Sequence, residues 1–301
     1  MAFYVPTADQ LSSLFPSYGN IQYLDKGGFK AVYTVERGGI KEALKLAHIP
    51  NPENVSEADR VEIIGEITKR VSREIGLLRD CICPYVVKLG SLDPIGVVIE
   101  NTNYIAYSEE FIEGEQLSRI IGRGLRPPEP ELRLLGKCLL SAIKEFWNNL
   151  KIVHRDIKPL NIIKTSTVSR PFVLLDLGIA YALRESSITR DPTNVPGTLY
   201  YLAPEMLQAN FRETLDYRSD LYTSGLTMYE YATGIQPFAS RGNEVGQTLY
   251  RILRERPASL KQLRSDLSDE FTGLVDQLLK KVPALRPGNI EQLISLLERG
   301  I

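Results

Sequence analysis

The stretch His-Arg-Asp-Ile-Lys-Pro-Leu-Asn at residues 154–161 decides the fold of this chain. Two short motifs follow it in order, Asp-Leu-Gly at 176–178 and Ala-Pro-Glu at 203–205. Asp176 lies 20 residues after Asp156, an interval that fits a loop, a short hairpin and the return of a second carboxylate to the same place. Either aspartate alone would be an ordinary turn residue, so the ordered set carries the signal.

The polar residues of these motifs are suited to phosphoryl transfer. Magnesium prefers oxygen ligands and shares them with substrate phosphates and water, so Asn161 and Asp176 are the predicted metal ligands. The acceptor hydroxyl must be held in line and give up its proton, and Asp156 is the candidate for both tasks. Lys158, two residues further on, would neutralise charge that develops on the transferred group.

The composition is that of an ordinary globular protein. The 301 residues are 43% hydrophobic and 24% charged, which is enough for a buried core and excludes a disordered chain. The formal net charge is −1, so the charge balance predicts neither nucleic acid nor an anionic membrane as a partner. The oligomeric state is left open.

The cysteine count indicates a reducing compartment. Cys81, Cys83 and Cys138 make an odd number without a disulfide framework. A zinc site at the first two is disfavoured, because the chain has only two histidines. No secretory signal and no run of 18 apolar residues is present, which predicts a cytoplasmic protein.

The first part of the chain is predicted to be rich in strands. Residues 1–19 form a short leader with two prolines, expected to pack on the lobe that follows. Apolar alternation and glycine turns predict five strands, at 21–25, 30–36, 40–46, 86–92 and 104–111. A long helix is predicted over 53–80, with one buried stripe at Val61, Ile64, Ile67, Val71, Ile75 and Leu78.

The remainder of the chain is predicted to be mainly helical. Apolar periodicity predicts helices at 129–150, 216–233, 247–254, 269–281 and 290–298. The motifs quoted above begin shortly after the change from strands to helices.

Together these motifs and elements resemble the protein kinase family from about residue 21 to residue 298. The resemblance implies an α+β, two-lobed fold, with a five-stranded antiparallel β lobe that carries one long helix and a larger, mainly helical lobe. It also implies a nucleotide-binding lobe at 20–112 and a catalytic and substrate-binding lobe at 113–301.

In this family, a lysine on the third strand contacts the nucleotide phosphates and pairs with a glutamate on the following helix. Lys45, in Glu-Ala-Leu-Lys at 42–45, matches the lysine. Glu74 is the expected partner, with Glu62 and Glu66 as alternatives.

The glycine-rich loop departs from the family pattern. Asp25 and Lys30 occupy the first and third glycine positions, and Gly27 keeps the second. A lysine at the third position could place a positive charge above the phosphates, or simply face solvent. The resemblance implies nucleotide contacts from Leu24, Gly27, Gly28, Phe29, Lys30, Val32 and Ala43.

The strand after the long helix is expected to lead into the adenine-binding segment. By resemblance, Glu110 and Ile112 present backbone groups to adenine. This register places Glu109 at the back of the adenine pocket. Because an unpaired buried carboxylate is costly, Glu109 must have a partner, or the register is wrong by one residue.

Residues 176–205 resemble an activation segment, which argues against a small-molecule kinase. Thr193 is the first choice for a regulatory phosphate, and Thr189, Ser186 and Ser187 follow. The resemblance also implies a structural ion pair of Glu205 with Arg286, and an Asp220 that braces the catalytic loop.

The sequence therefore predicts an ATP- and Mg²⁺-dependent protein kinase that phosphorylates serine or threonine of protein substrates. Lys158, together with Thr198 beside Gly197, resembles the serine/threonine branch. The alternative is a pseudokinase or nucleotide-binding scaffold, supported by the altered glycine loop and opposed by the intact Lys45 and Asp156.

Overall fold

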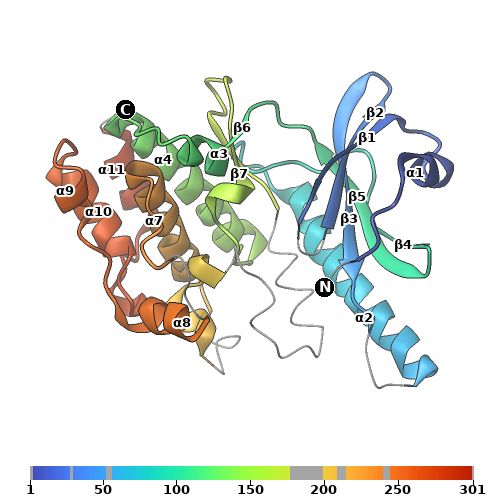
Figure 1. The fold of residues 1–301 in the computed structure, drawn as a ribbon. Helices are drawn as coiled ribbons and strands as arrows, with labels where there is room; N and C mark the ends of the chain where they lie inside the picture. The colour runs from blue at the N-terminus through green and yellow to red at the C-terminus, as the bar shows by residue number, and fades with distance from the viewer. Residues whose placement is uncertain are drawn as a thin grey trace. The chain divides into compact units, whose positions relative to one another are not determined.

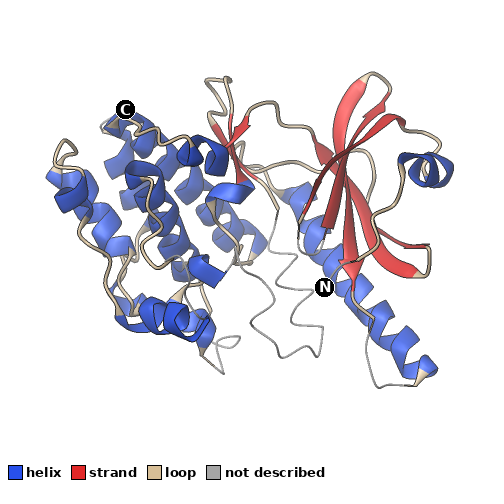
Figure 2. Cartoon of the chain, in the orientation of Figure 1, coloured by secondary structure: helices blue, strands red, loops and turns tan. Residues whose placement is uncertain are grey.

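The structure is a computed structural model that describes residues 3–27, 30–51, 56–176, 199–208, 215–239 and 245–299, with only the backbone of Arg70 and Glu74. The chain forms two compact units (Figure 1). The first contains Met1–Asp80 and Val87–Ile112, and the second contains Cys81–Val86, Glu113–Asp176 and Val195–Ile301. Figure 2 shows the large sheet in the first unit and most of the helices in the second.

The first unit is built on an antiparallel sheet of five strands in the order β1-β2-β3-β5-β4. Gly38 and Gly39 both have positive φ angles, 58° and 80°, and form the two-residue turn that joins β2 to β3. The strands are β1 (Gly19–Lys26), β2 (Lys30–Arg37), β3 (Ile40–Ile49), β4 (Ile95–Ile99) and β5 (Thr102–Glu110).

One face of this sheet carries the core of the first unit. Helix α1 (Ala8–Leu14) and its flanking residues pack there, and Phe3 and Leu11 lie in one apolar cluster with Tyr33 and Leu44. The hydroxyl of Tyr33 donates to the backbone carbonyl of Pro6 at 2.5 Å. The N-terminal residues thus cover the sheet by apolar packing and hydrogen bonds.

The long helix α2 (Glu57–Gly76) continues into a short 3-10 turn, Leu77–Asp80. Its buried stripe is shorter than predicted, since Ile67, Val71 and Ile75 are buried whereas Val61 is 65% exposed. The spacing of apolar residues predicts which side of a helix is buried, but it does not show over what length of the helix other elements pack against that side.

The predicted strand at 86–92 was wrong. The fourth strand in sequence is β4 (Ile95–Ile99), which pairs with the first half of β5. The segment before it does bond to β5: the Glu110 amide donates to the Lys88 carbonyl, and the Gly90 amide donates to the Ser108 carbonyl. These bonds are too irregular to make a strand.

The second unit is mainly helical. Its described helices are α3 (Leu117–Gly122), α4 (Glu129–Glu145), α7 (Arg218–Thr233), α8 (Val245–Arg254), α9 (Leu260–Leu263), α10 (Asp269–Leu278) and α11 (Ile290–Glu298). Helix α4 packs against α7 and α11, and α7 also packs against α10. A Cβ atom at Gly225 of α7 would lie 2.8 Å from the Cβ of Leu278, so the glycine permits this close helix contact.

Two helices end earlier than the apolar periodicity predicted. Helix α4 gives way at Glu145 to a wider turn, Phe146–Leu150, which closes at Lys151 with a left-handed φ of 56°. Helix α10 ends at Leu278.

A small sheet in the order β6-β7-β8, formed by Glu115–Gln116, Ile162–Lys164 and Phe172–Leu174, supplies the hairpin expected between Asp156 and Asp176.

Candidate active site

The loop at 154–161 is fixed to helix α7 by a buried aspartate. The backbone amides of His154 and Arg155 donate to the two carboxylate oxygens of Asp220, at 2.7 and 2.8 Å. Arg155 has a left-handed φ of 68°, a conformation that these hydrogen bonds help to hold. Burial raises the pKa of Asp220 to about 7, although the two amide hydrogen bonds act in the opposite direction.

The carboxylate of Asp156 is held by two neighbouring side chains. The Lys158 ammonium donates to its oxygens at 2.8 and 2.9 Å, and the Asn161 amide nitrogen donates at 2.8 Å. The same Asn161 nitrogen donates to the backbone carbonyl of Asp156 at 2.9 Å. All three side chains are buried, so the predicted base, the predicted phosphate cation and a predicted metal ligand form one cluster.

Asp176 is joined to this cluster through the backbone. The amide of Leu175, the preceding residue, donates to the carbonyl of Asn161 at 2.8 Å, and the Leu175 carbonyl lies 3.3 Å from Nε2 of His154. Burial lowers the pKa of His154 to about 4, so the ring is neutral at pH 7 and Nε2 can donate. Asp176 itself has a left-handed φ of 56°.

The residues present suit a magnesium ion that also binds nucleotide phosphates. Both side-chain hydrogen bonds from Asn161 come from its amide nitrogen, so the amide oxygen could serve as a metal ligand. Together with the Asp176 carboxylate, this gives two oxygen donors of the kind that Mg²⁺ takes. Among the described residues, no group of three or more His, Cys, Asp or Glu side chains gathers to hold a metal unaided. Phosphates and water would complete the coordination.

The expected ion pair of Glu205 and Arg286 forms in the second unit. Two guanidinium nitrogens of Arg286 donate to the two oxygens of Glu205, at 2.6 and 2.8 Å. Arg286 also donates to the backbone carbonyls of Lys280 and Arg218, both at 2.8 Å. Burial alone would raise the pKa of Glu205, but the hydrogen bonds and charge of Arg286 outweigh it and lower the pKa.

In the first unit, the partner that the structure describes for Lys45 is Glu109. Their side chains form a buried ion pair, with exposed fractions of 4% for Lys45 and 1% for Glu109. Glu109 therefore has the partner that its burial demands, and the register of the adenine-binding segment stays a prediction. The side chain of Glu74, the expected partner, lies outside the described residues.

The sheet register places several predicted nucleotide residues on one face. Val32 lies opposite Lys45, and Ala43 lies opposite Glu109. Side chains opposite each other, and those two residues apart, share a face. That face is the one opposite Leu44 and Tyr33, which belong to the core cluster.

The remaining nucleotide candidates lie at the edges of this unit. Leu24 is exposed on β1, and a Cβ atom at Gly27 would lie 3.6 Å from Cγ of Lys30. Glu110 ends β5 with its amide already bonded to the Lys88 carbonyl, and Ile112 follows in the loop. Gly28 and Phe29 lie outside the described residues, as do Thr189, Thr193 and Thr198 of the predicted activation segment.

The sequence interpretation missed one part-buried contact next to the Ala-Pro-Glu motif. The hydroxyl of Tyr201 donates to the carboxylate of Glu230 on α7. Burial raises the pKa of Glu230 to about 7. No local motif marks this pair, since the two residues are 29 positions apart.

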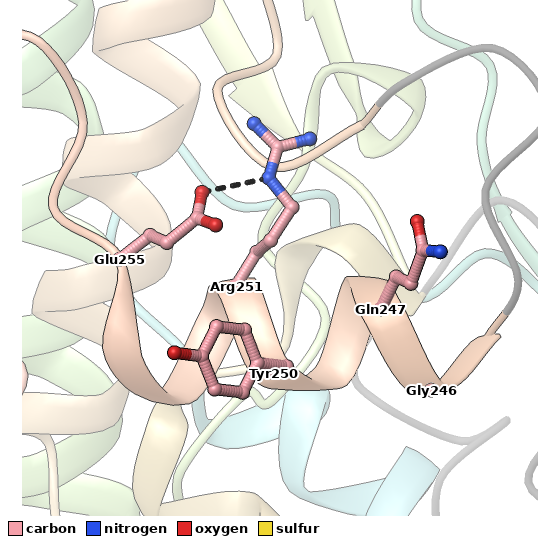
Figure 3. A pocket seen from close by; sticks show the side chains of 5 residues that line it. All are labelled: Gly246, Gln247, Tyr250, Arg251 and Glu255. Carbon is pink, nitrogen blue, oxygen red and sulfur yellow. Dashed lines mark hydrogen bonds and ion pairs between the residues drawn. The ribbon is translucent and has the colours of Figure 1, made fainter.

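A separate pocket of about 450 Å³ lies along α8 (Figure 3). Its lining includes Tyr250, Arg251 and Glu255, and Arg251 donates to Glu255 at 2.9 Å. The Arg251 guanidinium also donates to the carbonyls of Pro237 and Phe238, so this pocket is bordered by a structural arginine. Its described lining shares no residue with the motif cluster.

The family model of the protein kinase domain matches residues 18–296. This chain therefore belongs to the protein kinase family, and the predicted family and fold class are confirmed. Crystal structures of the Mycobacterium tuberculosis PknI kinase domain have the same fold. One has a TM-score of 0.63 and 19% identity, with 100% of each chain covered, and another has a TM-score of 0.65 with 94% and 95% covered.

Curated relatives are longer than this chain. The chain is 28% identical to mitogen-activated protein kinase kinase 1c of Physcomitrium patens, covering 91% of this chain and 74% of that protein. It is 29% identical to a probable serine/threonine-protein kinase of Clostridium perfringens, covering 94% of this chain but 38% of that protein. It is 34% identical to the dual specificity mitogen-activated protein kinase kinase mek-1 of Caenorhabditis elegans, covering 70% of this chain and 56% of that protein.

Proposed function

We propose that this protein kinase transfers the γ-phosphoryl group of ATP to serine and threonine side chains of proteins, with Mg²⁺ as the metal. The observation that carries the proposal is the buried cluster of Asp156, Lys158 and Asn161, held to α7 by Asp220. Such a cluster presents a carboxylate, a cation and an amide oxygen from one rigid loop.

In this mechanism, Asp156 orients the acceptor hydroxyl and takes its proton as the hydroxyl oxygen bonds to the γ-phosphorus. The bond from the γ-phosphorus to its bridging oxygen breaks, and ADP leaves with the electron pair. Lys158 stabilises the charge on the transferred group, and Lys45 orients the α- and β-phosphates. Asn161 and Asp176 would hold the magnesium ion, which supplies positive charge to the phosphates when bound.

The two parts of the chain have separate roles in this proposal. Residues 20–112 bind the nucleotide, with residues 1–19 as a leader packed on them, and residues 113–301 carry the catalytic loop and bind the protein substrate. Among the described helices, none is both long enough and apolar enough to span a bilayer. A cytoplasmic location is supported by the three cysteines, which are buried thiols rather than disulfides.

Regulation would come from a phosphate on the segment between Asp176 and Glu205. Thr193 is the proposed site, and Arg155, beside the base, is the proposed contact for its phosphate. Mass spectrometry after incubation with ATP and Mg²⁺ should find phosphate in this segment. A fully active protein with an unmodified segment would refute this mode of regulation.

Incubation of the purified chain with labelled ATP, Mg²⁺ and a generic protein acceptor tests the proposed activity. We expect label on serine and threonine, with Asp156→Asn as the matched inactive control. Nucleotide binding without transfer under all conditions would identify a pseudokinase, and label on a small molecule alone would identify a different acceptor class. Phosphoamino-acid analysis would reveal any tyrosine transfer.

A further inference from the structure

The ion pair of Lys45 and Glu109 joins two neighbouring strands of one rigid sheet. In the register of β3 and β5, Lys45 lies opposite Tyr107, and Glu109 lies two residues beyond Tyr107 on the same face. The Lys45 ammonium lies 6.0 Å from the centre of the Tyr107 ring. The charged pair therefore sits among sheet side chains, and its geometry follows from strand pairing.

Stability alone does not account for a charge pair at this place. Removing two charges from water costs several kcal/mol per ion, and a well-packed apolar pair of similar volume is often as stable or more stable. Both side chains are almost fully buried, at 4% and 1% exposure. A charged pair on the face that also carries Val32 and Ala43 therefore points to a role in the site.

We propose that Glu109 is a positioning residue for Lys45, holding the ammonium from the sheet so that it is directed at the nucleotide phosphates. The inference rests on the proposed function, because it assigns Lys45 to those phosphates. A lysine ammonium has three N–H donors, so the bond to Glu109 does not exclude bonds to phosphate oxygens as well. The carboxylate is provided by β5, and its position does not depend on α2.

The opposite role would be competition, in which Glu109 draws Lys45 away from the phosphates. The two roles predict opposite results for Glu109→Gln, which removes the charge and keeps the shape. Positioning predicts that kcat falls by about tenfold or more. The affinity for MgATP should be nearly unchanged, because the phosphates lose alignment rather than contact. Competition predicts tighter MgATP binding and equal or higher kcat, and either result would overturn the proposal.

A matched control separates this effect from the general loss of a buried carboxylate. Glu42 is a buried glutamate on β3 whose carboxylate accepts from the Ser91 amide at 3.0 Å. Glu42→Gln should lower stability while leaving kcat and MgATP affinity unchanged. Glu109→Asp keeps the charge on a shorter stem, so it should retain more activity than Glu109→Gln. Equal losses in all three variants would show a merely structural role and overturn the proposal.

A second readout does not depend on catalysis. A neighbouring carboxylate stabilises the protonated ammonium, so its removal makes the free amine more abundant at a given pH. In the nucleotide-free chain, Lys45 of Glu109→Gln should react several-fold faster with an amine-acylating reagent at fixed pH, as measured by mass spectrometry. Lys41, exposed on the same strand, is the internal reference and should not change.

The two readouts also separate failure of this inference from failure of the proposed function. If the chain transferred no phosphate at all, Lys45 acylation would still respond to Glu109→Gln and would still show that Glu109 holds Lys45. If Lys45 acylation were the same in wild type and Glu109→Gln, Glu109 would not hold the lysine, whatever the activity. Should Glu109→Gln fail to fold, Lys45 acylation is compared between wild type and Glu109→Asp instead. A smaller increase in the reactivity of Lys45 is then expected.

Discussion

Arg286 holds Glu205 through two parallel hydrogen bonds, deep in the second unit, and it also donates to three backbone carbonyls. The side chain of Arg286 is 0% exposed and that of Glu205 is 9% exposed. The pair connects Glu205, the last residue of the Ala-Pro-Glu motif, to the segment that precedes α11. Removing one partner would strand the other charge in a buried place.

Arg286→Ala should therefore lower the free energy of unfolding by about 3–5 kcal/mol and reduce activity. Denaturant unfolding of the whole chain measures this change. Arg79→Ala is the control, since Arg79 and Asp93 form an exposed ion pair, at 60% and 69% exposure, whose loss should cost about 1 kcal/mol or less. Equal costs at the two sites would contradict the structural role of Glu205 and Arg286.

Asp156→Asn should lower kcat by about 10²-fold or more, because asparagine cannot take up the acceptor proton. The amide keeps the size of the side chain and can still accept from Lys158, so MgATP affinity should be nearly unchanged. Single-turnover kinetics with a protein acceptor measures the first quantity, and nucleotide titration measures the second. Transfer close to that of wild type would remove Asp156 from its proposed role.

Asp176→Asn should raise the Mg²⁺ concentration needed for half-maximal activity. Asp176 has a φ of 56°, and asparagine tolerates the left-handed region, so the change removes a charge without adding backbone strain. Activity measured across a magnesium titration gives the shift, with the exposed Asp93→Asn as control. An unchanged magnesium requirement would exclude Asp176 as a ligand.

Lys30→Gly tests whether a side-chain charge replaces a missing glycine in the turn after β1. The amide of Gly27 donates to the Lys30 carbonyl at 2.8 Å, so a backbone hydrogen bond already joins these two residues. If the Lys30 ammonium contributes to phosphate binding, both Lys30→Gly and Lys30→Gln should weaken MgATP affinity, and Lys30→Arg should preserve it. An affinity unchanged or improved in Lys30→Gly would make Lys30 an ordinary surface residue.

Local sequence patterns predicted the elements and the motif cluster well. The loop with Asp156 and Asn161 is encoded within eight residues, so its chemistry could be inferred without tertiary information. The turn at Gly38 and Gly39 fixed the β2–β3 hairpin in the same local way. The strand β4 was not predicted although its run Ile-Gly-Val-Val-Ile is apolar, and the apolar run before it, at 86–92, was predicted to be the strand.

Contacts between distant residues were harder to predict. The pairing of Lys45 with Glu109 depends on the register of β3 against β5 across 64 positions, and a shift of one residue would turn Glu109 to the other face. The resemblance placed Glu109 at the back of the adenine pocket, but it could not identify the partner of the carboxylate. The bond of Tyr201 to Glu230 depends in the same way on how α7 packs.

Glu230 should make the stability of the protein fall as the pH rises from about 4.5 to about 7. Burial raises its pKa from 4.5 to about 7 in the folded chain. A raised carboxyl pKa stabilises the fold fully below the unfolded value, and this contribution is lost as pH rises through the folded value. The shift corresponds to roughly 3 kcal/mol of differential stability.

Glu230→Gln isolates this contribution. Asp220 acts in the same direction as Glu230, whereas the lowered pKa of His154 stabilises the fold above about 6.5 and is lost as pH falls toward 4. Both groups are present in wild type and variant, so the difference in unfolding free energy between the two chains reports Glu230 alone. That difference should be small at pH 5, should favour the variant increasingly up to about pH 7 and should level off above it, measured by denaturant unfolding. A difference that does not vary with pH would show that Glu230 ionises freely in the folded chain.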